Sequence, residues 1–195
     1  YNLGNVLRDL AKLQDAELSY RRAIEIKPDF AEAHYNLGNI LKDLGKLQEA
    51  EFSYRKAIEI KPDFAEVHSN LGVLLRDLGN LQEAEISYRK AIEIKPNFAE
   101  AHSNLGNILR NLGKLKEAEI SIRKAIELKP DFGQAHGNLG DILNELGYFQ
   151  EAKNYWIKAI ELVPNLKGVV ENLARRFYLD GEYDSAINYL RKDKS

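Results

Sequence analysis

Apolar residues recur along this chain in a pattern that returns every 34 residues. In residues 31–64 the first run of apolar positions has the three-to-four spacing of an amphipathic helix and comprises Ala33, Leu37, Ile40, Leu41 and Leu44. After Gly45 and Lys46, a second run with the same spacing comprises Leu47, Ala50, Tyr54, Ala57 and Ile58. Each copy therefore predicts a helix, a short turn and a second helix, and no strand pattern occurs in the sequence.

Glycine and proline mark the turns of the copies. A glycine suited to the left-handed conformation that ends many helices follows the first run at Gly45, Gly79, Gly113, Gly147 and Gly181. Proline disfavours helical geometry in the residue before it, and all five prolines stand 34 residues apart, at Pro28, Pro62, Pro96, Pro130 and Pro164. Asp63 and Glu66 have the spacing of a capping box, which predicts that the next helix starts there.

The period predicts an all-α solenoid that grows by stacking and has no single central core. We expect one repeat domain over residues 1–195, with a partial repeat at 1–30, full repeats at 31–64, 65–98, 99–132 and 133–166, and a partial or capping repeat at 167–195. Glycines in the middle of the first helices cost about 1 kcal/mol each relative to alanine, which predicts close approach of a neighbouring helix at Gly38, Gly72, Gly106 and Gly140. The large residues expected to fill the remaining space are Tyr20, Tyr54, Tyr88, Ile122 and Trp156.

These positions together resemble the tetratricopeptide repeat (TPR), whose pattern reads here as His34, Leu37-Gly38, Leu41, Ala50, Tyr54, Ala57 and Pro62. The sequence departs from the usual tryptophan of the family at His34 and from its usual tyrosine at Leu41. The resemblance covers the whole chain. It implies a right-handed α-solenoid superhelix in which the first helices line a concave groove, and a role in protein–protein interaction.

The recurring Asn-Leu-Gly-Asn phrase is similar, more narrowly, to the TPR arm of O-linked N-acetylglucosamine transferases and to bacterial TPR proteins. In that transferase arm one asparagine per repeat forms a ladder that holds the backbone of an extended polypeptide. The matching positions are Asn2, Asn36, Asn70, Asn104, Asn138 and Asn172. Nothing in the sequence resembles a glycosyltransferase catalytic domain.

Polar residues of the first helices supply the candidate groove. An asparagine amide both donates and accepts, so it can match the backbone of a peptide without reading its side chains. The alternative is that the asparagines only join neighbouring repeats. Variable positions beside the ladder are candidates for specificity, and they include Tyr35, Asn39, Lys42, Arg76, Asn107 and Arg110. Arg76 and Arg110 either meet a carboxylate of the ligand, pair with carboxylates of other repeats, or are simply solvated. The carboxylate clamp of the family needs a lysine in the Tyr35 column, and this chain has none there.

Composition and charge narrow the classes of function. A net charge of -2 and a pI near 6.2 argue against a nucleic-acid partner. No apolar run approaches the roughly 20 residues of a membrane helix. The chain has no cysteine, which removes disulfides and thiol catalysis and fits a reducing, cytoplasmic location.

Catalytic and metal chemistry have little support. The histidines at His34, His68, His102 and His136 occupy equivalent positions in stacked repeats, roughly 8–10 Å apart, and so cannot share one metal ion. There is no glycine-rich phosphate loop and no catalytic triad outside the repeated scaffold positions. We therefore expect no catalytic residue, metal or cofactor.

The sequence thus predicts a noncatalytic scaffold that binds an extended peptide or protein segment in its groove through the asparagine ladder. Two alternatives stay open. The chain could be the substrate-recruiting arm of a larger transferase, or a structural spacer whose copies associate end to end.

Overall fold

The computed structural model describes residues 1–9, 12–164, 166 and 168–192, and these residues form helices and turns without any strand. The helices, in chain order, are α1 (Asn2–Asp9), α2 (Leu13–Ile26), α3 (Ala31–Asp43), α4 (Leu47–Ile60), α5 (Ala65–Asp77), α6 (Leu81–Ile94), α7 (Ala99–Asn111), α8 (Leu115–Leu128), α9 (Gly133–Glu145), α10 (Phe149–Leu162), α11 (Val169–Leu179) and α12 (Tyr183–Lys192). Each odd-numbered helix packs on the even-numbered helix that follows it. The all-α class and the repeated helix–turn–helix are confirmed.

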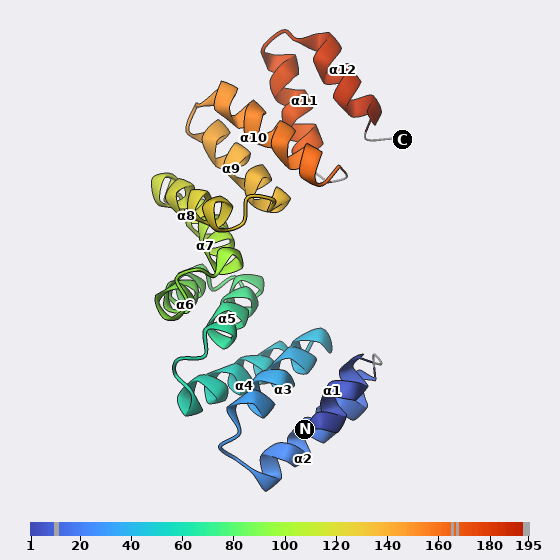
Figure 1. Ribbon diagram of the computed structural model, residues 1–195, viewed down its shortest axis with the longest axis vertical. Coiled ribbons are helices and arrows are strands. Elements are labelled where there is room, and N and C mark those ends of the chain that lie inside the picture. The colour runs from blue at the N-terminus through green and yellow to red at the C-terminus, as the bar shows by residue number, and fades with distance from the viewer. Residues whose placement is uncertain (10–11, 165, 167, 193–195) are drawn as a thin grey trace. The chain divides into compact units, whose positions relative to one another are not determined.

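The hairpins belong to two compact units, residues 1–96 and residues 97–195. Within unit 1, α2 packs on α3 and α4 packs on α5 (Figure 1). Within unit 2, α8 packs on α9 and α10 packs on α11 in the same manner. The second helix of one hairpin therefore supports the first helix of the next, which is the stacking of a solenoid. The single domain expected over residues 1–195 stays a prediction.

The turn glycines have the conformation that the sequence predicts. Gly45 has a φ of 76°, and the equivalent glycines of the later hairpins are also at positive φ. The Lys46 amide donates to the carbonyl of Leu41 at 2.8 Å, and the Gly45 amide donates to that of Lys42 at 2.9 Å. This bond pair is a Schellman motif, which satisfies carbonyls at the end of α3 and turns the chain into α4.

The predicted capping box is wrong. The residue that precedes α5 is Phe64, whose side chain caps no amide of this helix. Because the helix begins after Phe64, Asp63 lies one residue too early to reach the N-terminal amides. The carbonyl of Phe64 instead accepts from the amides of Val67 and His68, at 3.1 and 3.3 Å. Glu66 instead pairs with Lys95, at the end of α6 in the same hairpin, at 2.9 Å.

The glycines inside the first helices allow close approach of a side chain, as predicted. A Cβ atom added at Gly38 would lie 2.6 Å from the ring of Tyr54, and one added at Gly140 would lie 2.5 Å from the ring of Trp156. The tyrosine is fully buried and the tryptophan nearly so. In each of the first five hairpins one large side chain of the second helix is therefore seated on a glycine of the first, which fits the tight packing of protein interiors.

The histidines pack against the turns. In three hairpins Nε2 of the histidine lies 2.9–3.0 Å from a proline carbonyl, in the pairs His34–Pro28, His68–Pro62 and His136–Pro130. Each histidine thus fixes the loop that enters its own helix. None of the described helices is long and apolar enough to cross a membrane.

Candidate functional site

The candidate site is the polar surface of the odd-numbered helices, which we call the ladder face. In unit 1 it is carried by α1, α3 and α5, and in unit 2 by α7, α9 and α11. The even-numbered helices cover the apolar side of these helices. The candidate residues of the sequence analysis all lie on the odd-numbered helices.

The ladder asparagines of unit 1 are bonded to the preceding hairpin. Nδ2 of Asn70 donates to the hydroxyl of Tyr35 at 3.0 Å and to Oδ1 of Asn39 at 2.9 Å. Asn36 repeats the arrangement. Its Nδ2 donates to the hydroxyl of Tyr1 at 3.1 Å and to Oδ1 of Asn5, the equivalent of Asn39, at 3.4 Å. Both hydrogens of the Asn70 amide are therefore used inside the protein, and only its oxygen is left to meet another group.

A buried tyrosine holds the acceptor of this network in place. The hydroxyl of Tyr54 donates to Oδ1 of Asn39 at 2.8 Å, and that of Tyr20 donates to Oδ1 of Asn5 at 2.6 Å. Burial raises the pKa of Tyr54 well above its ordinary value, so its hydroxyl stays a neutral donor. A chain of hydrogen bonds thus runs from the second helix, through Asn39, to Asn70 of the next hairpin.

The third hairpin of unit 1 lacks this acceptor. Val73 stands in the position of Asn39, and the buried hydroxyl of Tyr88 has no hydrogen-bond partner among the residues that the structure describes. Burial raises the pKa of Tyr88 as it does for Tyr54. The network is therefore broken where an apolar residue replaces the asparagine.

In unit 2 a carboxylate takes the place of Asn39. Oδ1 of Asp141 accepts from Nε1 of Trp156 and from Nδ2 of Asn172, both at 2.9 Å. Its other oxygen accepts from Nη1 of Arg110 at 3.0 Å, and Arg110 also binds Glu145 at 2.6 Å. The same helix positions therefore carry a charged network in unit 2 and a neutral one in unit 1.

Accessibility differs among the ladder asparagines. Asn36 and Asn138 are each only 7% exposed, so they present little surface to a ligand. The sequence analysis expected Asn36 in the groove, whereas in the structure it is buried and its nitrogen is bonded to Tyr1 and Asn5 of the preceding hairpin. Asn70, Asn104 and Asn172 are half-buried, and Asn2 is exposed at the start of α1.

The remaining candidates lie beside the ladder. Tyr35 packs against Phe64, with ring centroids 5.1 Å apart, while Lys42 and Asn107 are half-buried. Arg76 pairs with its neighbour Asp77 at 2.7 Å. The alternative to a ligand carboxylate was pairing between repeats, which Arg110 shows with Asp141 and Glu145, whereas Arg76 pairs within its own helix.

A pocket of about 260 Å³ opens on the ladder face of unit 2. We call it the charged pocket, and its lining is Arg110, Asp141, Asn144, Glu145, Phe149, Trp156, Asn172, Arg175, Arg176 and Leu179. The sequence analysis did not select Asn144, Arg175 or Arg176. The signal for Arg175 was its departure from the Asn39 column, in which the other residues are Asn, Val or Asp.

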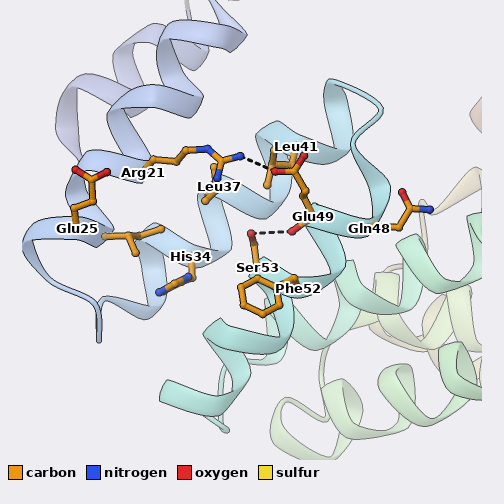
Figure 2. Close-up of a pocket in the computed structure, with 10 residues that line it drawn as sticks. Arg21, Glu25, His34, Leu37, Leu41, Gln48, Glu49, Phe52 and Ser53 are labelled. Atoms are coloured by element: carbon orange, nitrogen blue, oxygen red, sulfur yellow. Dashed lines mark hydrogen bonds and ion pairs between the residues drawn. The ribbon is translucent and has the colours of Figure 1, made fainter.

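A second pocket, of about 480 Å³, lies among α2, α3 and α4 on the other side of unit 1. Figure 2 shows Arg21 reaching Glu49, an ion pair of 2.7 Å, beside Phe52 and His34. Ser53 donates to the carbonyl of Glu49 at 2.9 Å. The apolar part of the pocket lining includes Leu37 and Leu41. Of its charged side chains, Arg21 and Glu49 are bound to each other.

Among the residues that the structure describes, no group of three or more His, Cys, Asp or Glu side chains could hold a metal ion.

The sequence matches four family models of one kind. Models described as "Tetratricopeptide repeat" match residues 31–64 and 99–132, residues 53–86, and residues 133–166. A model described as "TPR repeat" matches residues 4–45 and 74–113. Together these matches span residues 4–166. No curated protein sequence matches the chain.

Solved structures agree with the family models. A crystal structure of MamA superimposes with a TM-score of 0.77 at 25% identity, over 83% of this chain and 95% of that one. YrrB, described as a TPR protein with an unusual peptide-binding site, gives 0.75 at 26% identity over 88% of each chain. PilF of Pseudomonas aeruginosa gives 0.86 at 22% identity, over 96% of this chain and 86% of that one, a similarity that concerns the fold alone.

Proposed function

Because the chain belongs to the tetratricopeptide repeat family, we propose that it is a noncatalytic protein-interaction scaffold that holds an extended peptide segment on its ladder face. Domains of this family serve in general as interaction scaffolds. The peptide-binding site named for YrrB, which is similar over 88% of this chain, supports a peptide as the class of ligand.

The observation that carries the proposal is the fixed amide of Asn70. Its nitrogen makes two hydrogen bonds to the preceding hairpin, so the side chain is held in one orientation with its oxygen left over. A group that is already ordered loses little conformational entropy when a ligand binds. The nitrogen of Asn172 is held by a single hydrogen bond to Asp141.

The chemistry of such an oxygen defines what it can bind. It accepts hydrogen bonds, and an extended peptide presents unpaired backbone N–H groups along its length. Backbone N–H groups are common to every residue except proline, so recognition by the ladder tolerates many sequences. In this proposal the reachable members, Asn70 in unit 1 and Asn104 and Asn172 in unit 2, each take N–H groups of a segment bound on the ladder face of their own unit, and the flanking residues add preference.

Substitution of two asparagines, Asn70 and Asn104, distinguishes a binding role of the ladder from a purely structural one. The side chain of Asn70 makes two hydrogen bonds within unit 1, whereas that of Asn104 makes none to the described residues of unit 2. If the ladder binds peptide, Asn70→Ala and Asn104→Ala should both weaken binding, while only Asn70→Ala should also lower stability. If the asparagines serve the fold alone, binding should be unchanged in Asn104→Ala.

The experiment uses peptides selected on the wild-type chain from a display library of random 12-residue sequences. Loss of one neutral hydrogen bond should weaken binding about two- to tenfold, measured by fluorescence anisotropy. Gln82→Ala is the matched control, since it truncates an exposed amide on α6, away from the ladder face. An affinity for Asn104→Ala equal to that of Gln82→Ala would contradict the proposal.

A further inference from the structure

The charged pocket of unit 2 holds one cation that has no partner. Arg175 is exposed on α11 and stands where the hairpins before it carry an uncharged residue or Asp141. It lies three residues after Asn172, so both side chains point from the same side of the helix. Among the described residues it makes no hydrogen bond or ion pair.

The other charges of the pocket are already compensated. Arg110 is bound by Asp141 and Glu145, at 3.0 and 2.6 Å. Arg176 pairs with Asp180 at 2.7 Å and lies over the ring of Phe149, 4.2 Å from its centroid.

The polar side chains of the lining are similarly occupied. Asp141 accepts from Trp156, Asn172 and Arg110, so its oxygens are satisfied. Within the described part of the chain, Arg175 and the amide of Asn144 are the polar side chains of the lining that have no partner. They come from adjacent odd-numbered helices, α11 and α9.

We propose that the charged pocket selects a carboxylate on the bound segment and holds it with the guanidinium of Arg175 and the amide of Asn144. A planar guanidinium can bind a carboxylate through two parallel N–H groups, and an amide can donate a third hydrogen bond. One unpaired cation matches a single negative charge. The doubly charged phosphate group fits less well, because Asp141 and Glu145 line the same pocket.

The position of the pocket connects it to the ladder. Asn172 lines the pocket and is also the last ladder asparagine, so a segment that donates an N–H to Asn172 passes beside Arg175. This inference deepens the proposed function and rests on it. The site differs from the family's carboxylate clamp, because the column that needs a lysine has Ser103, Gly137 and Glu171 in unit 2.

The test is a selection of random 12-residue peptides on the wild-type chain, on Arg175→Ala and on Lys158→Ala. Lys158 is an exposed cation on α10 that pairs with Glu161 outside the pocket, so its variant is a control of equal charge. Two libraries are used, one with the carboxyl terminus blocked by fusion and one with it free, to distinguish a side-chain carboxylate from a terminal one. Circular dichroism checks that each variant is folded.

The expected result is enrichment of acidic residues, or of a free terminus, on the wild type and on Lys158→Ala and its loss on Arg175→Ala. For a selected peptide, replacing its carboxylate by the amide and replacing Arg175 by Ala should each weaken binding about tenfold. The two changes together should cost no more than one alone, because they remove the same contact. Higher salt should reduce the difference in affinity between the wild type and Arg175→Ala.

Three results overturn the inference alone, and a fourth overturns the proposed function with it. The wild type could select peptides that need no carboxylate, Arg175→Ala could keep the same enrichment, or the two losses could simply add. If the wild type selects no peptide above a blank surface, the proposed function fails, and the inference fails with it. A wild type that selects peptides without a carboxylate preference leaves the proposed function standing and removes the inference alone.

Discussion

The ladder faces of the two units use the same helix positions with different chemistry. In unit 1, Asn39 accepts from Tyr54 and from Asn70, which gives a neutral network. In unit 2, Asp141 accepts from Trp156 and Asn172 at the equivalent positions and adds an ion pair with Arg110. The comparison shows that the acceptor joining one hairpin to the next is retained while its charge changes.

The exceptions support this interpretation. Val73 removes the acceptor and leaves the hydroxyl of Tyr88 buried without a partner. Ile122 removes the donor, and its hairpin keeps Asn107 in the acceptor column. The large residue of the second helix is therefore required for packing on its glycine, whereas the hydrogen bond is an addition that some hairpins lack.

Substitution of Asp141 should have the largest effect on the difference between the two units. Asp141→Val should lower the free energy of unfolding by about 3 kcal/mol, because Trp156, Asn172 and Arg110 all lose their acceptor. Asp141→Asn keeps one acceptor oxygen, as unit 1 does, and should cost about 1 kcal/mol or less. Urea denaturation measures both. Equal losses for the two variants would show that charge, and not the acceptor, joins the hairpins.

Removing the hydroxyl of two tyrosines in unit 1 should change the stability less, and the two changes should differ in sign. Tyr54→Phe should destabilise by about 1 kcal/mol, since it leaves Oδ1 of Asn39 short of one donor. Tyr88→Phe should be neutral or stabilising by up to about 1 kcal/mol, because it removes a buried hydroxyl that has no partner. Thermal melts of the two variants make the comparison, and a destabilisation of Tyr88→Phe as large as that of Tyr54→Phe would contradict it.

The two units also differ in one ion pair between hairpins. Glu17 pairs with Lys46 at 2.9 Å in unit 1, whereas in unit 2 the charges are reversed, with Lys153 bound to Asp180 and Glu182 at 2.9 and 2.8 Å. Lys153 is 136 residues after Glu17, which is four repeats along the chain. The reversal predicts different responses to pH.

In unit 1 the stability that the ion pair contributes should be lost at acidic pH. Burial alone would raise the pKa of Glu17, but hydrogen bonds from Lys46 and Arg21 lower it below its usual value. A lowered carboxyl pKa contributes stability above the unfolded pKa, and this is lost as pH falls through the folded pKa, below about pH 4.5. Glu17→Gln should therefore flatten the stability profile below about pH 4.5 and leave the alkaline side unchanged.

In unit 2 the stability that the corresponding ion pairs contribute should also be lost at alkaline pH. The hydrogen bond to Glu182 raises the pKa of Lys153, and the bond from Lys153 lowers that of Asp180. A raised lysine pKa contributes stability below the unfolded pKa, which is lost as pH rises through the folded pKa, above about pH 10.5. Lys153→Met should flatten the profile there. Tryptophan fluorescence, from the single Trp156 of unit 2, follows this titration.

The sequence was sufficient for the fold because each copy repeats the same local signals. The turn glycines, the pairing of Gly38 with Tyr54 and the second-helix alanines all take the roles that spacing predicts. The capping box failed because helix α5 begins after Phe64, and the exact first residue of a helix depends on how the preceding turn packs.

The candidate site was predicted less completely. Periodicity places Asn36 and Asn70 on one side of their helices, but it does not show that their nitrogens bind the preceding hairpin. That contact depends on how far one hairpin is rotated on the next. The same geometry pairs Arg110 with two carboxylates and leaves Arg175 without a partner, a difference that the spacing of charges alone does not reveal.

The most direct test of peptide binding by the ladder is an N-methyl scan of a selected peptide, with affinities measured on the wild type and on Asn104→Ala. If an asparagine oxygen takes a backbone N–H, methylation of that nitrogen should weaken binding about two- to tenfold on the wild type and have no further effect on Asn104→Ala. Peptides that bind equally well when each backbone nitrogen is methylated in turn would contradict the account.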